Sequence, residues 1–191
     1  MRYKILFLLM FVLSVTFFGI NITGAEPVPA KGGPFPEITL PVPEKAGEKE
    51  YLGLTGNKPF RISQIKADLV ILEIFSMYCP YCQKEAPNVN ELYQTVSKRA
   101  GVKDRIKIIG VGAGNTAFEI DVFRTQYDIR FPLFSDESFS IHKLVGEVRT
   151  PHFFVIRINA DGSNTIVYSK VGSIEDSKQF LDMIIKESGL K

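Results

Sequence analysis

The sequence lacks tryptophan and has only two cysteines and two histidines. Only two residues separate Cys79 from Cys82, so a structural disulfide would close too small a loop to stabilise the fold much. A zinc site at this pair would need two further ligands, and His142 and His152 do not form a compact pair. Both interpretations stay open, but neither accounts well for the pair. No cysteine follows the apolar N-terminal run, so nothing indicates a lipoprotein.

A large charge imbalance is also absent. The formal net charge is +2, and Arg2 and Lys4 supply the excess, so nothing predicts a nucleic-acid partner. These two residues precede an apolar run from Ile5 to Phe18, and small residues at 23–25 offer a cleavage site. This order is typical of a secretory signal. Alternatively, apolar character that continues to Ile22 gives about 18 residues, the lower limit for an uncleaved membrane anchor.

We therefore predict three regions. Residues 1–25 form a signal peptide or N-terminal anchor, residues 26–34 form a Pro- and Gly-rich linker, and residues 35–191 form one α/β domain. Either outcome for the N-terminus places the domain outside the cytoplasm, in the periplasm or on the outer face of the cytoplasmic membrane. In such an oxidising compartment, a lone cysteine pair is more consistent with chemistry than with a structural bond.

The cysteine pair lies between a predicted strand and a predicted helix. Leu69–Phe75 is an apolar run with the length and β-branched content of a buried strand. From Pro80, a residue suited to a first helical turn, the pattern is helical to about Arg99. Cys79 is thus expected at a helix N-terminus, where the helix dipole and unpaired N–H groups stabilise a thiolate. We expect Cys79 to attack or carry a disulfide, and the more shielded Cys82 to resolve it.

Further elements follow from apolar periodicity and turn residues. We predict no firm element over 43–56. We interpret the glycines at 110, 112 and 114 as a strand-end loop rather than a nucleotide-binding site. Strands alternating with helices, followed by a hairpin and a last helix, predict an α/β fold with a central mixed sheet. The predicted elements are an edge strand at 35–40, a strand at 60–63 with Ser63 capping a turn, a strand at 105–111, a helix at 116–127, a strand at 131–134, a weak helix at 138–144, a strand at 152–158, a hairpin returning through 165–168 and a helix from Ser173 to Lys186.

With these features in place, the sequence resembles the thioredoxin superfamily, and it is most similar to exported thiol–disulfide oxidoreductases of the TlpA/ResA type. The resemblance spans residues from about 35 to 188 and implies a thioredoxin fold, a central mixed sheet flanked by helices, with an N-terminal strand extension. Residues 73–76 also resemble the DsbA type. The motifs that carry the resemblance are Phe35–Leu40, Cys79-Pro80-Tyr81-Cys82, Glu85-Ala86-Pro87, Phe131-Pro132-Leu133 and Thr150-Pro151.

The resemblance implies roles for three residues outside the cysteine pair. Thr150-Pro151 would be a cis peptide bond that brings Thr150 near the Cys79 sulfur; the alternative is a trans proline that opens an edge strand. Glu73 would be a buried acid that accepts the proton of Cys82 during resolution. The alternative for Glu73 is a solvent-facing glutamate or one paired with a lysine.

The predicted site has a catalytic and a substrate-binding part. We expect Cys79, Cys82 and Glu73 to be catalytic. No metal or cofactor is expected, and the partners would be protein thiols or disulfides and a membrane redox partner, with the protein itself a monomer. The substrate-binding residues would be Tyr78, Pro80, Tyr81, Thr150 and Pro151.

Two other functions compete with thiol–disulfide exchange. A thiol peroxidase of the peroxiredoxin group is consistent with Ser76 three residues before Cys79, although Leu72 stands where that motif has proline. A copper-binding assembly factor on the same fold would use both cysteines and a histidine, although that relative has three residues between its cysteines. The Pro80-Tyr81 dipeptide leaves open whether the protein reduces or oxidises its substrates.

Overall fold

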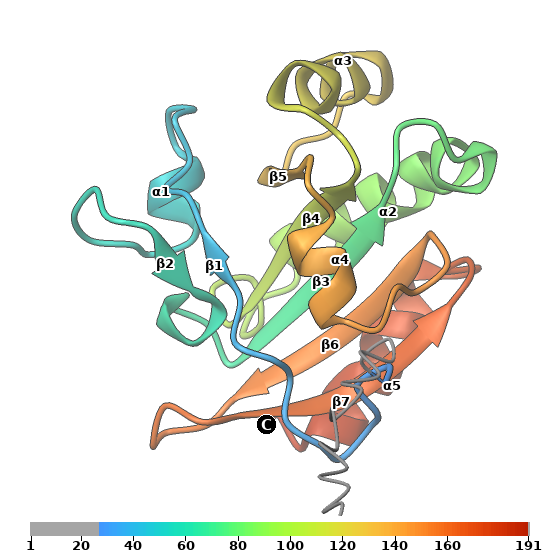
Figure 1. Ribbon diagram of the computed structural model, residues 1–191. Coiled ribbons are helices and arrows are strands. Elements are labelled where there is room, and N and C mark those ends of the chain that lie inside the picture. Colours follow the sequence, from blue (N-terminus) through green and yellow to red (C-terminus); the bar gives the residue numbers. More distant parts are fainter. Residues whose placement is uncertain (1–26, 191) are drawn as a thin grey trace, which may run out of the picture.

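The computed structural model describes residues 27–190, and the predicted signal or anchor at 1–25 lies outside this part. Among the described residues, no helix combines the length and the apolar character that crossing a bilayer requires. The chain is organised around a five-stranded sheet with the strand order β5-β4-β3-β6-β7 (Figure 1). Its strands are β3 (Leu69–Phe75), β4 (Ile106–Ala113), β5 (Leu133–Asp136), β6 (His152–Ile158) and β7 (Asn164–Val171).

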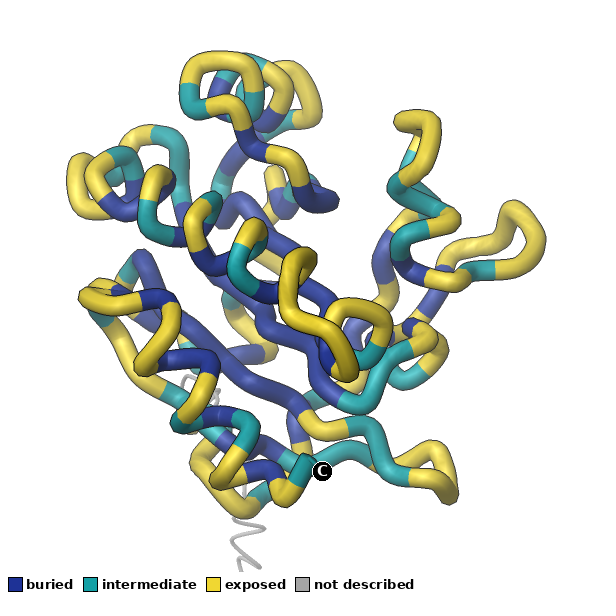
Figure 2. The backbone as a smooth tube through the Cα atoms, turned by 180° about the vertical axis from the view of Figure 1, so that it is seen from behind, coloured by how far each residue is buried: buried dark blue, intermediate teal, exposed yellow. Residues whose placement is uncertain are grey.

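The sheet is mixed, as the sequence predicts. β3 pairs in parallel with β4 and β4 with β5, whereas β6 runs antiparallel to both β3 and β7. Every residue of β3 and β4 is buried, and Figure 2 shows these strands as a continuous dark-blue centre beneath the helices. Central parallel strands covered on both faces carry apolar side chains on both sides, which is why the two runs lack polar alternation.

Helices and the N-terminal extension cover the two faces of the sheet (Figure 1). One apolar cluster joins the odd-numbered residues of β3 to α2, α3 and α5, and a second joins the even-numbered ones to α4 and the extension. The extension contains α1, the short β1–β2 pair and a 3₁₀ turn, η1. The bounds are β1 Thr39–Leu40, α1 Glu48–Tyr51, β2 Phe60–Arg61, η1 Ile62–Gln64, α2 Pro80–Lys98, α3 Ala117–Tyr127, α4 Ser140–Leu144 and α5 Ser177–Ser188.

Two predictions for the extension need correction. The edge strand expected over 35–40 is reduced to Thr39–Leu40, which pairs with β2 outside the main sheet. Prolines on both sides of this segment have no N–H to donate, so its pairing stops early. Ser63 does not cap a turn but lies inside η1, whose N-cap is Arg61. The helix α1 occupies part of the segment for which no element was predicted.

The glycine-rich segment does not form the expected loop, because Gly110 and Gly112 lie within β4. A Cβ atom on Gly110 would lie 2.5 Å from the side chain of Leu133, and one on Gly112 would lie 2.3 Å from that of Ile120. Glycine therefore allows β5 and α3 to pack closely on the strand. Only Gly114, with φ of 67°, has the left-handed backbone of a turn after the strand.

The last helix begins later than predicted, and Ser173 is not its cap. Asp176 is the N-cap of α5, and its carboxylate accepts a hydrogen bond from the N–H of Gln179 at 2.8 Å. The Ser173 hydroxyl instead donates to the carboxylate of Glu85 on α2. A serine near a helix start can satisfy either a backbone amide or a distant acceptor, and sequence alone does not separate the two.

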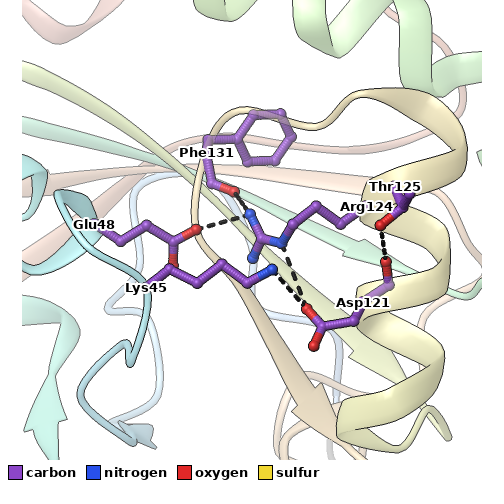
Figure 3. Close-up of polar contacts among 6 residues, drawn as sticks. All are labelled: Lys45, Glu48, Asp121, Arg124, Thr125 and Phe131. Carbon is purple, nitrogen blue, oxygen red and sulfur yellow. Dashed lines mark hydrogen bonds and ion pairs between the residues drawn. The ribbon is translucent and has the colours of Figure 1, made fainter.

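Arg124 of α3 forms an ion pair with Glu48 in the N-terminal extension (Figure 3). Its guanidinium lies 2.7 Å from the Glu48 carboxylate of α1 and donates to the carbonyl of Phe131 at 2.9 Å. The side chains of Arg124 and Glu48 are only 11% and 14% exposed, so the pair is largely withdrawn from water. Lys45 and Asp121 extend this cluster at the surface.

We expect Arg124→Met to lower the free energy of unfolding by about 3 kcal/mol, because it leaves the Glu48 carboxylate buried without its cation. The double variant Arg124→Met/Glu48→Leu should recover most of that loss, because an apolar pair of similar volume replaces the ion pair. Urea unfolding of the reduced proteins measures both values. Equal losses in the single and double variants would contradict the assignment.

Candidate active site around Cys79 and Cys82

Cys79 lies at the junction between β3 and α2, as predicted. It is the N-cap of α2, with extended backbone angles of −83° and 116°, and Pro80 is the first helical residue. The N–H of Cys79 donates to the carbonyl of Ser76 at 3.1 Å, which closes the turn between the strand and the helix. The sulfur of Cys79 is half-buried, whereas Cys82, one turn later, is fully buried.

The surroundings of Cys79 favour its thiolate. Partial burial alone would raise the pKa of Cys79, but hydrogen bonds from the Thr150 side chain, from the Cys82 thiol and from the N–H groups of Cys82 and Tyr81 outweigh it. The pKa of Cys79 therefore lies below its ordinary value. In the protonated state the Cys79 thiol points at the carbonyl oxygen of Thr150, at 3.3 Å. A thiol with a lowered pKa and an accessible sulfur is a reactive nucleophile.

Cys82 has the opposite character. Burial raises the pKa of Cys82, and the nearby charge of Glu73 raises it further, although a backbone hydrogen bond at Ser76 works the other way. The Cys82 thiol is therefore neutral at ordinary pH, and it becomes a nucleophile only when a base removes its proton.

Glu73 is a buried acid in the centre of the sheet, so the solvent-facing alternative is wrong. It is 3% exposed and lies in β3 between Gly110 of β4 and Phe153 of β6. Its Oε1 atom has no hydrogen-bond partner among the described residues. Burial first, and then the negative charges of Glu85 and Cys79, raise the pKa of Glu73 to about 8. Its role as proton acceptor stays a prediction.

A second buried carboxyl group, Glu85, was not among the predicted site residues. It is 2% exposed and accepts hydrogen bonds from the N–H of Ile174 at 2.6 Å, from the amide of Asn88 at 3.0 Å and from the Ser173 hydroxyl. A signal for its burial was present, because Glu85 follows Cys82 by three residues and so shares the inner face of α2. Two of its three partners, Ser173 and Ile174, lie almost ninety residues away in the chain, and no signal for them is present in the sequence.

Two further residues missed by the sequence analysis hold the loop before Cys79. The side-chain oxygen of Asn115 accepts the N–H of Met77 at 2.9 Å, and the Gln83 amide donates to the carbonyl of Met77 at 2.8 Å. Asn115 is fully buried, and its amide nitrogen has no partner within the described part of the chain. Both polar groups of the Met77 backbone are therefore fixed from outside the loop.

The predicted substrate-binding residues surround Cys79. Thr150-Pro151 is a cis peptide bond, as predicted, at the entry to β6. Tyr78 and Tyr81 are 65% and 74% exposed on either side of the cysteine, and the Tyr78 hydroxyl donates to the Glu119 carboxylate. Pro80 lies exposed in the first turn of α2. The structure thus brings all eight predicted site residues together.

The two histidines take part in contacts away from the sulfurs. The ring of His142 lies 2.8 Å from the carbonyl oxygen of Val148, and His152 lies 3.1 Å from the Ser169 hydroxyl. Burial lowers the pKa of His152 to about 4. Across residues 27–190, no group of three or more His, Cys, Asp or Glu side chains is arranged to hold a metal ion.

The pKa of Glu73 makes stability depend on pH. The folded protein keeps this proton up to about pH 8, whereas the ordinary value is 4.5. Between these values the folded state holds one more proton than the unfolded state, so the free energy of unfolding falls by about 1.4 kcal/mol per pH unit as the pH rises. Relative to the parent protein, we expect Glu73→Gln to gain about 2 kcal/mol or more at pH 8 and almost nothing at pH 5.

Urea unfolding of the reduced proteins at both pH values measures this difference. Glu91→Gln, which removes an exposed carboxylate from the same domain, is the matched control and should change stability little at either pH. A Glu73→Gln effect of the same size at pH 5 and pH 8 would contradict the pH-linked account.

Comparison with known proteins agrees with this geometry. Two proteins named thiol-disulfide oxidoreductase ResA are similar to the chain. The first, from Bacillus thuringiensis subsp. konkukian, is 28% identical over 130 residues, which cover 68% of this chain and 69% of that protein. The second, from Geobacillus thermodenitrificans, is 25% identical over 184 residues, which cover 96% and 94%. These relatives confirm the prediction of a thiol–disulfide oxidoreductase.

A solved structure confirms the predicted fold. The thioredoxin domain of a thiol-disulfide oxidoreductase from Bacteroides vulgatus superposes with a TM-score of 0.61, covering 81% of this chain and 98% of that one at 13% identity. Residues 32–169 match the sequence model of the AhpC/TSA family. The chain therefore belongs to the AhpC/TSA family and has a thioredoxin fold.

Proposed function

We propose that the protein is an extracytoplasmic thiol–disulfide oxidoreductase that exchanges its Cys79–Cys82 dithiol or disulfide with cysteines of exported proteins. One observation carries this proposal: Cys79 is half-exposed at a helix start with a lowered pKa, and Cys82 is buried one turn later with a raised pKa. One accessible thiolate and one protected thiol are the two groups that a stepwise exchange requires.

The first step in the reducing direction is attack by the Cys79 thiolate on a substrate disulfide. A bond forms between the Cys79 sulfur and one substrate sulfur, the substrate S–S bond breaks, and the other substrate sulfur leaves as a thiolate that takes a proton from water. The α2 N–H groups that lower the pKa of Cys79 keep this thiolate populated. The backbone beside the cis Thr150-Pro151 bond lies next to the reacting sulfur and offers a surface for an extended substrate.

The second step is attack by Cys82 on the Cys79 sulfur. The enzyme disulfide forms and the second substrate thiolate leaves, so the substrate gains the two electrons that the enzyme loses. Because burial raises the pKa of Cys82, its proton needs an acceptor close by. We assign this role to Glu73: with a pKa of about 8 it is partly ionised near neutral pH, and the ionised fraction, which grows as the pH rises, can accept the proton of Cys82. In the oxidising direction the same steps run in reverse.

The cellular setting is part of the proposal. Arg2, Lys4 and the apolar run from Ile5 to Phe18 support export, by a cleaved signal or an anchor. Outside the cytoplasm, a membrane redox partner would regenerate the enzyme, which would contribute to the thiol redox balance of that compartment. The reduction potential of the pair decides the direction: a value near about −270 mV indicates a reductant and one near about −120 mV an oxidant.

Serine variants of the two cysteines test the order of attack. With a disulfide-bonded protein such as insulin, we expect reduced Cys82→Ser to accumulate a mixed disulfide through Cys79, because the resolving thiol is gone. Cys79→Ser should form no mixed disulfide. Mass spectrometry after acid quenching identifies the adduct. Exchange that persists in Cys79→Ser would overturn the proposal, and rapid consumption of hydrogen peroxide without exchange would favour the thiol peroxidase alternative.

The role of Glu73 is tested on the second step alone. We expect Glu73→Gln to slow resolution of a preformed Cys79 mixed disulfide by about 100-fold near pH 7, because the proton of Cys82 loses its acceptor. Single-turnover kinetics between pH 6 and 9 measure the rate, and formation of the mixed disulfide should change much less. Unchanged resolution rates across this range would reject the role, and Glu91→Gln serves as the control.

A further inference from the structure

A pocket of about 440 Å³ lies directly beside the Thr150-Pro151 bond, between the first turns of α2 and the end of β7. Tyr81 and Val171, which are 74% and 38% exposed, supply apolar surface to its walls. Lys84 of α2 and Arg149, the residue before Thr150, contribute its positive charges. The pocket lies next to the reacting sulfur, because the Cys79 thiol contacts the carbonyl of Thr150, which lines the pocket.

The two cations of the pocket are not neutralised within the fold. Both are exposed, and neither forms an ion pair with another residue in the 27–190 part of the chain. Arg61, Arg99 and Arg124, in contrast, each face a carboxylate. An arginine and a lysine that both line a pocket and have no anionic partner among the described residues favour a carboxylate, which a guanidinium binds through two parallel hydrogen bonds.

The carboxylate inside the pocket does not serve as their partner. Glu85 also lines the pocket, but its oxygens accept hydrogen bonds from Ile174, Asn88 and Ser173 and contact neither cation. With Lys84 and Arg149 positive, the pocket keeps an excess of positive charge even when Glu85 is ionised. The site is therefore complementary to a negatively charged group with an apolar neighbour.

We propose that this pocket binds an acidic side chain of the protein substrate, close in sequence to its reactive cysteine, and that Lys84 and Arg149 determine this specificity. The inference rests on the proposed function and adds the chemical class of the preferred substrate. A glutamate or aspartate near the substrate cysteine would pair with Lys84 and Arg149, and an apolar residue beside it would pack on Tyr81 and Val171. The two cations would thereby select among exported proteins that all offer the same sulfur chemistry.

Three small disulfides of equal core and different charge test the charge preference. We expect the reduced protein to react with 3,3′-dithiodipropionate faster than with cystamine, relative to neutral bis(2-hydroxyethyl) disulfide. In Lys84→Gln/Arg149→Gln, the ratio of the dithiodipropionate rate to the neutral rate should fall about fivefold, the size expected for exposed ion pairs. The neutral disulfide reports any change in the reactivity of Cys79 itself, and added salt should reduce the preference.

Two disulfide-linked peptides, identical except for Glu or Gln next to the cysteine, test whether the acid belongs to a polypeptide. We expect the Glu peptide to have a higher kcat/KM with the parent protein and no advantage with the double variant. Lys58→Gln/Lys103→Gln removes two exposed lysines outside the pocket and should keep the preference, which controls for net charge.

The outcomes separate this inference from the proposed function. Reduction of the neutral disulfide at equal rates by all variants, with no charge order among the small disulfides, overturns the inference and leaves the exchange activity intact. A charge order that persists in Lys84→Gln/Arg149→Gln, or one shown by the small disulfides but not by the peptides, also overturns it. No reaction of Cys79 with any disulfide overturns the proposed function and the inference together.

Discussion

The hydrogen bonds that the first turn of α2 offers to the Cys79 sulfur are the interaction on which the site depends. They exist because β3, buried along its whole length, ends at a fixed point, and Pro80 starts a helix there without needing its own N–H. The same turn directs Cys82 inward, where no solvent stabilises a thiolate. One structural junction therefore produces both reactivities, and each variant that loosens it would make the two sulfurs more alike.

Two buried carboxyl groups near that turn, those of Glu73 and Glu85, differ in their hydrogen-bond partners. Glu85 is surrounded by donors from Ile174, Asn88 and Ser173, whereas one oxygen of Glu73 has no partner among the described residues. Burial raises the pKa of Glu73, and no hydrogen-bond donor to this oxygen within residues 27–190 offsets that rise. The fold thus holds one carboxyl group with hydrogen bonds and leaves the other with a raised pKa, at a cost in stability that grows as the pH rises from 4.5 to about 8. That cost makes sense when the unpartnered group handles a proton.

The sequence predicted the parts of the fold that local patterns determine. The strand at 69–75, the helix from Pro80 and the hairpin after 158 follow from apolar periodicity, a first-turn proline and turn residues. The burial of Glu73 was implied by the family resemblance, together with its place in an apolar run, and the structure confirms it. Ser173 was misassigned because its true partner, Glu85, is remote in the chain. Gly110 and Gly112 were misassigned to a loop because their role in the strand is visible only when α3 and β5 pack against it. The contacts of Arg124 are equally invisible in a linear pattern (Figure 3).

The surface around Cys79 carries negative charge on one side and positive charge on the other. This distribution affects how a substrate chain would lie across it. On the α3 side, Glu119 accepts hydrogen bonds from Tyr78 and from Thr116, which hold the pKa of its carboxyl group below the usual range and keep it negative. On the β7 side, Lys84 and Arg149 are positive and have no ion-pair partner within residues 27–190. Charges of opposite sign on either side of a reacting sulfur favour one direction of an extended chain over the other. The charges that flank Cys79 would thus orient the substrate chain with which it reacts.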